Sequence, residues 1–101
     1  MEQRIKLQRI LEDLLESKYV YFQPPSSMRI EYPCIIYERA PDDRKYANGQ
    51  LYKRMRKYNL IVIDRNSDTE IPDKISKLPL VSFNKCYMMN NLNHYSFTIY
   101  Y

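Results

Sequence analysis

The sequence predicts one α+β domain spanning residues 1–101, in which two helices pack on one face of a mostly antiparallel sheet. Three observations predict it: an amphipathic N-terminal segment, an Asn-Gly turn signal between two apolar runs, and a strictly alternating C-terminal run. The expected order is helix, short strand, two long strands, helix, two strands. A chain of 101 residues that is 45% hydrophobic can bury a core but is too small for two domains.

The first 18 residues predict an amphipathic helix. Its apolar residues recur at three- and four-residue spacing and comprise Ile5, Leu7, Ile10, Leu11, Leu14 and Leu15. Charged residues of both signs occupy the other side, whereas a helix bound to a membrane surface would carry a basic face. We therefore expect this helix to lie on the protein's own sheet, and the charges along it indicate neither a signal peptide nor a membrane span.

Three strands are predicted in the following part of the chain. Residues 19–22 form a short β-prone run that Pro24 and Pro25 end, and residues 34–40 and 58–64 form two longer apolar runs. Between the longer runs, Asn48-Gly49 is the strongest two-residue hairpin signal in the chain and contains its only glycine. The two longer strands should therefore form one hairpin.

This turn also predicts how the two longer strands pair. With the turn as the centre, residues whose numbers sum to 97 face each other, so that Cys34 faces Ile63. The same register continues the ribbon toward the turn, with a bulge or an edge at Pro41. The sequence thus predicts a long β-hairpin arm that projects beyond the core.

A second, short helix is predicted to start near Thr69, because Pro72 suits the first turn of a helix. Ser67 and Glu70 have the spacing of a capping box. One apolar face and a terminating proline define the rest of the helix, which comprises Ile71, Ile75, Leu78 and Pro79. We expect this helix to pack beside the first.

The last residues predict a strand by strict alternation. One face holds Tyr95, Phe97, Ile99 and Tyr101, and the other holds His94, Ser96, Thr98 and Tyr100. This strand pairs naturally with residues 80–89 across an asparagine-rich turn at 90–93. Bringing Val81 and Phe83 to the face of Phe97 requires an odd offset or a β-bulge.

The sequence predicts no catalytic residue and no bound cofactor. Its single glycine rules out the phosphate-binding loops that need several glycines. His94 is the only histidine, and no spacing places a cysteine or serine beside it as a nucleophile, so we expect it on the polar face of the last strand. Asp42 and Asp43 are neighbours that point to opposite faces of a strand, which suits no acid–base pair.

The cysteines and the acidic residues predict no metal site. Cys34 and Cys86 follow no paired spacing, so we expect two buried, reduced thiols and a reducing cytosol, not a disulfide or a zinc site. Four carboxylates lie near one another without the spacing or the glycine of a calcium loop, and we interpret them as loop and helix-cap residues: Asp64, Asp68, Glu70 and Asp73.

Basic and aromatic residues concentrate in the predicted arm. The chain is only modestly basic, with a net charge of +4, yet eight residues interleave cations with tyrosines: Arg44, Lys45, Tyr46, Tyr52, Lys53, Arg54, Arg56 and Lys57. Cations beside stacking rings are typical of proteins that bind single-stranded nucleic acid. However, Asp42 and Asp43 lie on the same ribbon, and a strand divides its side chains between two faces. We interpret the eight residues as assembly or partner contacts, with nucleic-acid binding as the alternative.

A set of short motifs is spread along the chain from residue 19 onward. They are FQPP at 22–25, YPCIIYE at 32–38, YKR at 52–54, IVID at 61–64, SDTEIP at 67–72 and NLNH at 91–94. In these motifs the chain resembles the small tail-terminator or tail-completion (neck) proteins of tailed bacteriophages. The motifs are structural patterns and carry no catalytic signature.

The resemblance implies a ring, commonly of six copies, that caps the finished tail tube and joins it to the neck beneath the head. Its partners would be further copies of the chain, the tail tube protein and the neck or connector protein, with contacts to passing DNA that lack sequence specificity. It implies no enzymatic activity, no cofactor and no membrane partner, and a place in the virion tail after assembly in the bacterial cytoplasm. Two alternatives stay open: a head-completion or neck adaptor on the portal side, which could have twelve copies, and a small basic nucleic-acid-binding module.

Overall fold

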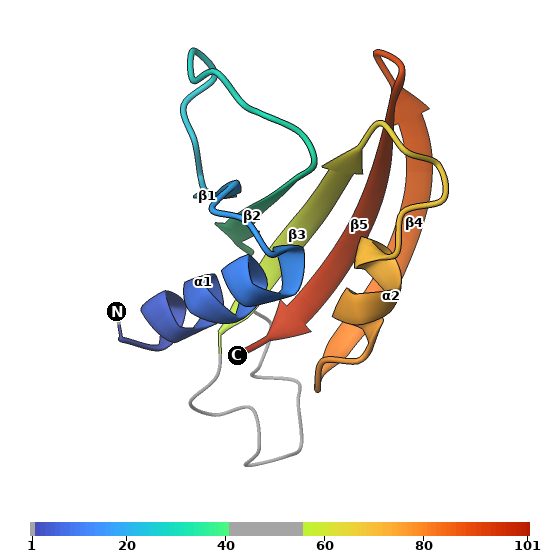
Figure 1. Ribbon diagram of the computed structural model, residues 1–101. Helices are drawn as coiled ribbons and strands as arrows, with labels where there is room; N and C mark the ends of the chain where they lie inside the picture. The colour runs from blue at the N-terminus through green and yellow to red at the C-terminus, as the bar shows by residue number, and fades with distance from the viewer. Residues whose placement is uncertain (1, 41–55) are drawn as a thin grey trace.

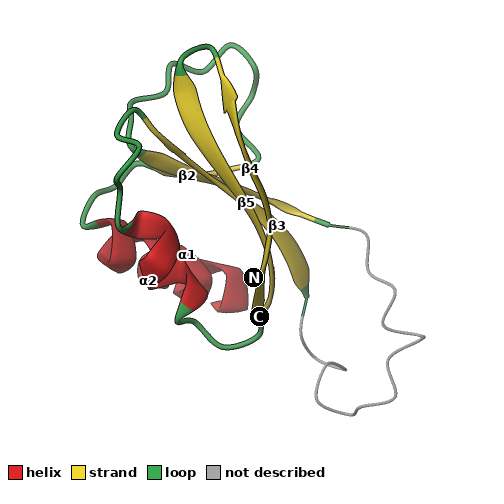
Figure 2. Ribbon diagram, turned by 90° about the vertical axis from the view of Figure 1, so that its right-hand side faces the viewer, coloured by secondary structure: helices red, strands yellow, loops and turns green. Residues whose placement is uncertain are grey.

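Two helices lie on one face of a five-stranded sheet in the computed structural model, which describes residues 2–40 and 56–101 (Figures 1 and 2). The elements in chain order are α1 (Glu2–Leu15), β1 (Val20–Phe22), β2 (Cys34–Arg39), β3 (Lys57–Asp64), α2 (Ile71–Ser76), β4 (Val81–Met89) and β5 (Leu92–Tyr100). This order and the mostly antiparallel sheet confirm the predicted α+β fold. The predicted arm and its Asn48-Gly49 turn lie outside the described residues.

The strands lie in the order β1-β2-β3-β5-β4. β1 runs parallel to β2, and all other neighbours are antiparallel. Across β2 and β3, Cys34 lies opposite Ile63 and Tyr37 lies opposite Leu60, which is the register that the turn signal predicts. Because β5 inserts between β3 and β4, the sheet ends in β1 on one side and in β4 on the other.

The hairpin of β4 and β5 has one irregularity. Phe83 lies opposite Phe97, and the register then shifts between Phe83 and Lys85, which confirms the bulge as the way to bring Phe83 to the face of Phe97. The turn is tighter than the predicted segment, since only Asn90 and Asn91 separate the two strands. Both asparagines have positive φ angles, 55° and 63°, which a two-residue hairpin turn requires and asparagine tolerates.

α1 is shorter than predicted and buries a narrower apolar stripe. It ends at Leu15, where Glu16 adopts a left-handed φ of 59°. Ile5, which the spacing placed in the apolar stripe, is largely exposed. The buried side chains of both helices form one core with the strands: Leu7, Leu11, Leu15, Ile35, Tyr37, Leu60, Val62, Ile75, Phe97 and Ile99. The predicted packing of the two helices beside each other is confirmed (Figure 1).

α2 begins at Ile71, close to the predicted start near Thr69, and Ser67 and Glu70 do not form a capping box. Ser67 lies within a turn that the hydrogen bond from Thr69 N to Asn66 O closes (3.3 Å), so it precedes the helix by too many residues to cap it. Glu70 occupies the N-cap position without a side-chain bond, and the Thr69 hydroxyl accepts the Ile71 N–H instead (3.3 Å). The apolar face holds as predicted, with one fully buried residue, Ile75, at its centre.

The buried hydroxyl of Tyr37 ties α1 to the sheet. It donates to Gln8 Oε1 (2.6 Å), and Gln8 Nε2 donates to the Val20 carbonyl oxygen (2.9 Å). Arg4 donates to the same hydroxyl (3.3 Å), and its guanidinium lies 4.4 Å from the centre of the Phe22 ring. Burial raises the pKa of Tyr37, which Arg4 partly offsets, so the hydroxyl keeps its proton and donates.

Replacing Tyr37 by phenylalanine should lower the free energy of unfolding by about 1–2 kcal/mol, because Gln8 loses its donor in a partly buried site. Urea titration followed by circular dichroism measures the change. Tyr21→Phe is the matched control, since Tyr21 lies on the other sheet face and its hydroxyl has no partner among the described residues. Equal stability of the Tyr37→Phe variant and the wild type would contradict the role of this bond.

Candidate interaction surface

His94 is buried in β5 rather than exposed on a polar strand face. Its Nδ1 lies 3.0 Å from the Leu92 carbonyl oxygen, and its ring stacks on Tyr87 with 4.9 Å between the ring centres. The alternation of the sequence does place His94 on the sheet face away from the helices. The expectation of a polar, solvent-facing position was wrong because Tyr87, from the neighbouring strand, covers the ring.

Cys34 lies too far from His94 to act with it as a nucleophile. Cys34 lies opposite Ile63, and Ile63 lies opposite His94, so two strand spacings, roughly 10 Å, separate their backbones. Burial, with a smaller contribution from the charge of Asp64, raises the pKa of the Cys34 thiol from 9.0 to about 12. Cys34 is therefore the buried, free thiol that the sequence predicts, and its raised pKa keeps it protonated.

Cys86 is exposed, so the prediction of two buried thiols was half wrong. It lies on β4 opposite Tyr95, and β4 has a neighbouring strand on one side only. A strand at the edge of a sheet and a strand at its centre share the same alternation of side chains. The local sequence therefore could not show that Cys86 faces solvent.

Two of the four acidic residues take the predicted loop and helix-start positions. Asp68 lies in the turn before α2, and Asp73 lies in the first turn of α2, where a carboxylate suits the helix dipole. Asp64 is the last residue of β3, and its Oδ1 accepts the N–H of Asn66 (2.9 Å). Glu70 makes no capping bond with its side chain. Within residues 2–40 and 56–101, no three His, Cys, Asp or Glu residues come together in a way that could hold a metal ion.

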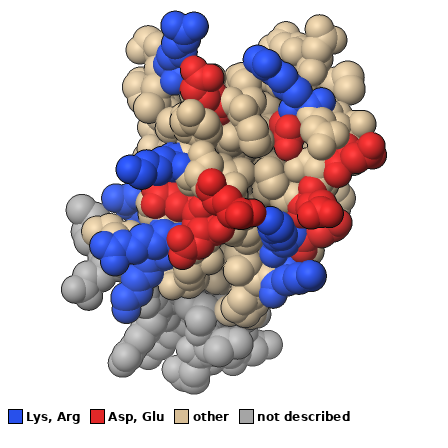
Figure 3. Space-filling model, viewed as in Figure 1, with Lys and Arg blue, Asp and Glu red and all other residues tan. Residues whose placement is uncertain are grey.

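The structure describes two of the eight predicted contact residues, Arg56 and Lys57. Arg56 is exposed, and its backbone exchanges two hydrogen bonds with Tyr101 (3.1 and 2.9 Å), while Lys57 begins β3 opposite Tyr100. The other six lie outside the described residues: Arg44, Lys45, Tyr46, Tyr52, Lys53 and Arg54. On the face seen in Figure 3, acidic side chains gather across the middle with basic ones on both sides, so the described part of this face is not uniformly basic.

β4 is a long sheet edge with exposed apolar side chains. It has nine residues, no proline and one charged residue, Lys85. Phe83 is 53% exposed, Met88 65% and Met89 50%. This surface was not predicted, although the sequence holds one signal of it: Met88 and Met89 are neighbours that point to opposite faces, and both are apolar. Apolar side chains that stay exposed on both faces of an edge strand do not stabilise the single chain, so β4 is a candidate contact surface.

The opposite edge, β1, is protected. It has only three residues, and Pro24 and Pro25 follow shortly after it. Tyr19 and Gln23 form backbone hydrogen bonds with β2. Because alternate residues of a strand bond to the same neighbour, the backbone N–H and C=O of Val20 point away from β2. Val20 N donates to Lys18 O (2.8 Å), and Val20 O accepts from Gln8 (2.9 Å), so both groups are occupied. The two edges of the sheet therefore differ in their capacity to accept another strand.

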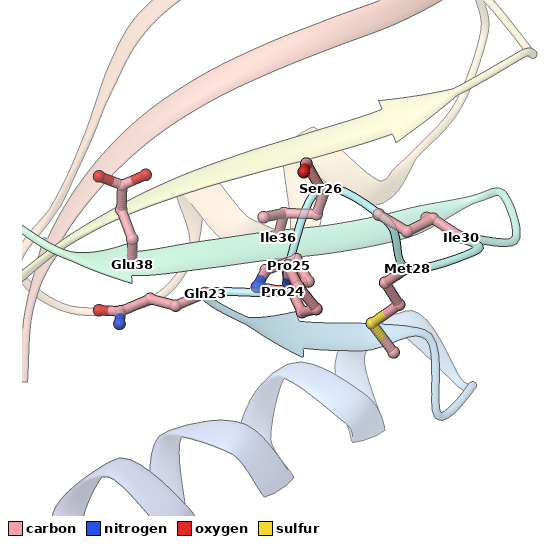
Figure 4. Close-up of a pocket in the computed structure, with 8 residues that line it drawn as sticks. All are labelled: Gln23, Pro24, Pro25, Ser26, Met28, Ile30, Ile36 and Glu38. Carbon is pink, nitrogen blue, oxygen red and sulfur yellow. The ribbon is translucent and has the colours of Figure 1, made fainter.

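A groove of about 490 Å³ lies beside β2, on the sheet face away from the helices. Figure 4 shows Ile36 and Glu38 pointing from β2 away from α1, while the loop after β1 forms the other wall. Gln23 holds the start of that loop, because its Oε1 accepts the Arg39 N–H (3.1 Å). The lining residues are mostly apolar and comprise Gln23, Pro24, Pro25, Ser26, Met28, Ile30, Ile36 and Glu38.

The described residues thus offer two contact surfaces, the β4 edge and the groove beside β2. Comparison with known protein families, with curated protein sequences and with solved structures gives no match. In the described ranges, neither helix is long and apolar enough to cross a membrane. The β4 edge and the groove beside β2 are therefore the candidate interaction sites of the described residues.

The two cysteines should differ sharply in reactivity. In the folded protein at pH 8, Ellman's reagent should modify Cys86 within minutes, whereas Cys34 should react only after denaturant is added, because it is buried and protonated. Absorbance of the released thiolate measures both steps. The Cys86→Ser variant should lose the fast step, and two fast steps in the wild type would contradict the burial of Cys34.

Folding stability should fall as the pH rises above 9. The Cys34 thiol ionises near pH 9.0 in the unfolded chain but only near 12 in the folded one, so the unfolded state binds fewer protons between these values. The expected loss is up to about 1.4 kcal/mol per pH unit. Urea titrations between about pH 8 and 10.5 should show a smaller slope for Cys34→Val than for the wild type.

The comparison of slopes isolates the contribution of Cys34. Burial also raises the pKa values of Tyr37 and Tyr95, so both tyrosines add to the alkaline loss in every variant. If the free energy of unfolding falls as steeply with pH in Cys34→Val as in the wild type, ionisation of the Cys34 thiol is not a cause of the alkaline loss.

Proposed function

We propose that the protein is a structural subunit that forms a ring with further copies of itself, and that this ring ends the tail tube of a tailed bacteriophage and joins it to the head–neck connector. The observation that carries the proposal is β4, a nine-residue edge strand on which Phe83, Met88 and Met89 are at least half exposed. An exposed apolar edge is a template for contact with another chain. The proposed role uses contact surfaces and needs no reacting group.

The difference between the two sheet edges supports a ring over a symmetric pair. β1 is short and its outward backbone groups at Val20 are occupied, whereas β4 is long and exposed. When unlike surfaces of identical copies meet, the contact is head-to-tail, and repeating it closes a ring if the rotation between copies permits. A ring is also what the resemblance to tail-terminator proteins implies.

The resemblance supports the place of this ring in a phage tail. Three of its six motifs fall on elements that border the two contact surfaces: FQPP at 22–25 ends β1 and begins the wall of the groove, YPCIIYE at 32–38 contains most of β2, and NLNH at 91–94 begins β5 beside β4. The basic residues from Arg44 to Lys57 are proposed to contact a neighbouring subunit or the tail tube.

Light scattering on a sizing column should give a native mass near six times the 12.3 kDa of one chain. Replacing Met88 and Met89 together by lysine should weaken self-association by about tenfold or more, because charges on an apolar edge oppose contact with a second chain. Ile5→Lys is the matched control, since Ile5 is also apolar and exposed but lies on α1, and it should keep the wild-type mass.

Salt and nucleic acid separate the alternatives. A mass near twelve copies would support the adaptor on the portal side. A monomer whose mass rises only with a single-stranded oligonucleotide, and falls again at high salt, would overturn the ring in favour of a nucleic-acid-binding module. A monomer under every condition would overturn self-assembly itself.

A further inference from the structure

We infer that the groove beside β2 receives the β4 edge of the neighbouring copy in the ring. This inference rests on the proposed function, because it names the two surfaces that the head-to-tail contact would join. β1 and β2 begin the strand order and β4 ends it, so the groove and the edge lie at opposite sides of one sheet (Figure 1). Identical copies can therefore meet groove to edge in unbroken succession.

Part of the β4 surface points to the same sheet face as the groove. On β4, Lys85 lies opposite Ser96 and Met89 opposite Leu92, which places both on the face away from the helices. On β2, Ile36 and Glu38 point to that face, and Figure 4 shows them turned away from α1. A neighbouring copy can present Lys85 and Met89 to the groove without either copy moving its helices.

The apolar parts of the two surfaces match in character. Most of the groove is lined by Pro24, Pro25, Met28, Ile30 and Ile36, which leaves an apolar channel open to solvent. The end of β4 offers Met89 on this face, and its unbranched and polarizable side chain adapts to irregular apolar surfaces. Burial of Met89, which is 50% exposed, against the apolar lining of the groove would remove apolar surface of both copies from water.

Each surface also carries one charge, and the two charges are opposite in sign. Glu38 stands at one end of the groove with Ile30 at the other (Figure 4), and Lys85 is the only charged residue of β4. Among the described residues neither has an ion-pair partner, and Lys85 Nζ lies 5.3 Å from the centre of the Tyr87 ring. Lys85 and Met89 are four residues apart on β4, which is roughly 13 Å along the strand. If Met89 lies in the groove near Ile30, Lys85 therefore lies toward Glu38.

Exchange of the two charges tests the contact. Glu38→Lys and Lys85→Glu should each weaken self-association of the full chain by about tenfold or more, because each places like charges against each other. The double variant E38K/K85E should return to within about threefold of the wild type, since the reversed pair attracts again. Sedimentation equilibrium measures the dissociation constants.

Two control variants change the net charge of the chain by the same amounts. Asp13→Lys matches Glu38→Lys, and Lys6→Glu matches Lys85→Glu, but both lie on the exposed surface of α1 and should leave self-association unchanged. Circular dichroism and urea titration show whether each variant is folded. Any loss confined to the groove and edge variants therefore reports the contact and not the overall charge.

The outcomes separate the contact from the ring. A wild type that assembles, with single variants that assemble equally well or a double variant as weak as both losses combined, overturns the groove contact and leaves the proposed function standing. A wild type that stays monomeric overturns the ring, and the groove contact falls with it. Weaker assembly of each single variant together with recovery in the double variant supports both the groove contact and the ring.

Discussion

The placement of α1 on the sheet depends on the hydrogen bonds of one side chain, Gln8. It accepts a bond from the buried hydroxyl of Tyr37 on β2 and donates to the outward carbonyl of Val20 on β1. A buried hydroxyl without a partner is destabilising, so α1 docks where Gln8 reaches both groups. The side chain that holds the helix on the sheet therefore also occupies the outward carbonyl of Val20 at the β1 edge. The difference between a closed edge at β1 and an open edge at β4 follows from how the core is built.

The bulge in β4 decides which side chains the open edge presents to which face. Phe83 packs edge-on against Phe97 on the face of the helices, with 5.4 Å between ring centres. In a regular strand Lys85 would share that face, but the register shift after Phe83 turns it to the other side, with Tyr87 and Met89. One extra residue thus places the only charge of β4 on the same face as Glu38 and the groove.

Local patterns in the sequence predicted the elements and the pairing of β2 with β3, because one turn fixed a register that alternation then extended from Cys34 to Arg39. They could not predict that β5 inserts between β3 and β4, since strand order depends on packing between distant segments. Two of the errors follow from that gap. His94 is covered by Tyr87, and Cys86 is exposed, because β4 is an edge. The groove was not predicted because its two walls, a loop and a strand, come together only in the folded chain.

Lys85 also distinguishes between two ways in which a second copy can meet β4. In a symmetric antiparallel pairing of two β4 strands about their centres, Lys85, the middle residue of nine, would lie opposite the Lys85 of the second copy. Like charges directly opposite each other destabilise a strand pair. Contact with the groove instead brings the same lysine to a carboxylate. A central lysine on an apolar edge therefore opposes the closed pair and permits the unlike contact, which is the kind that repeats around a ring.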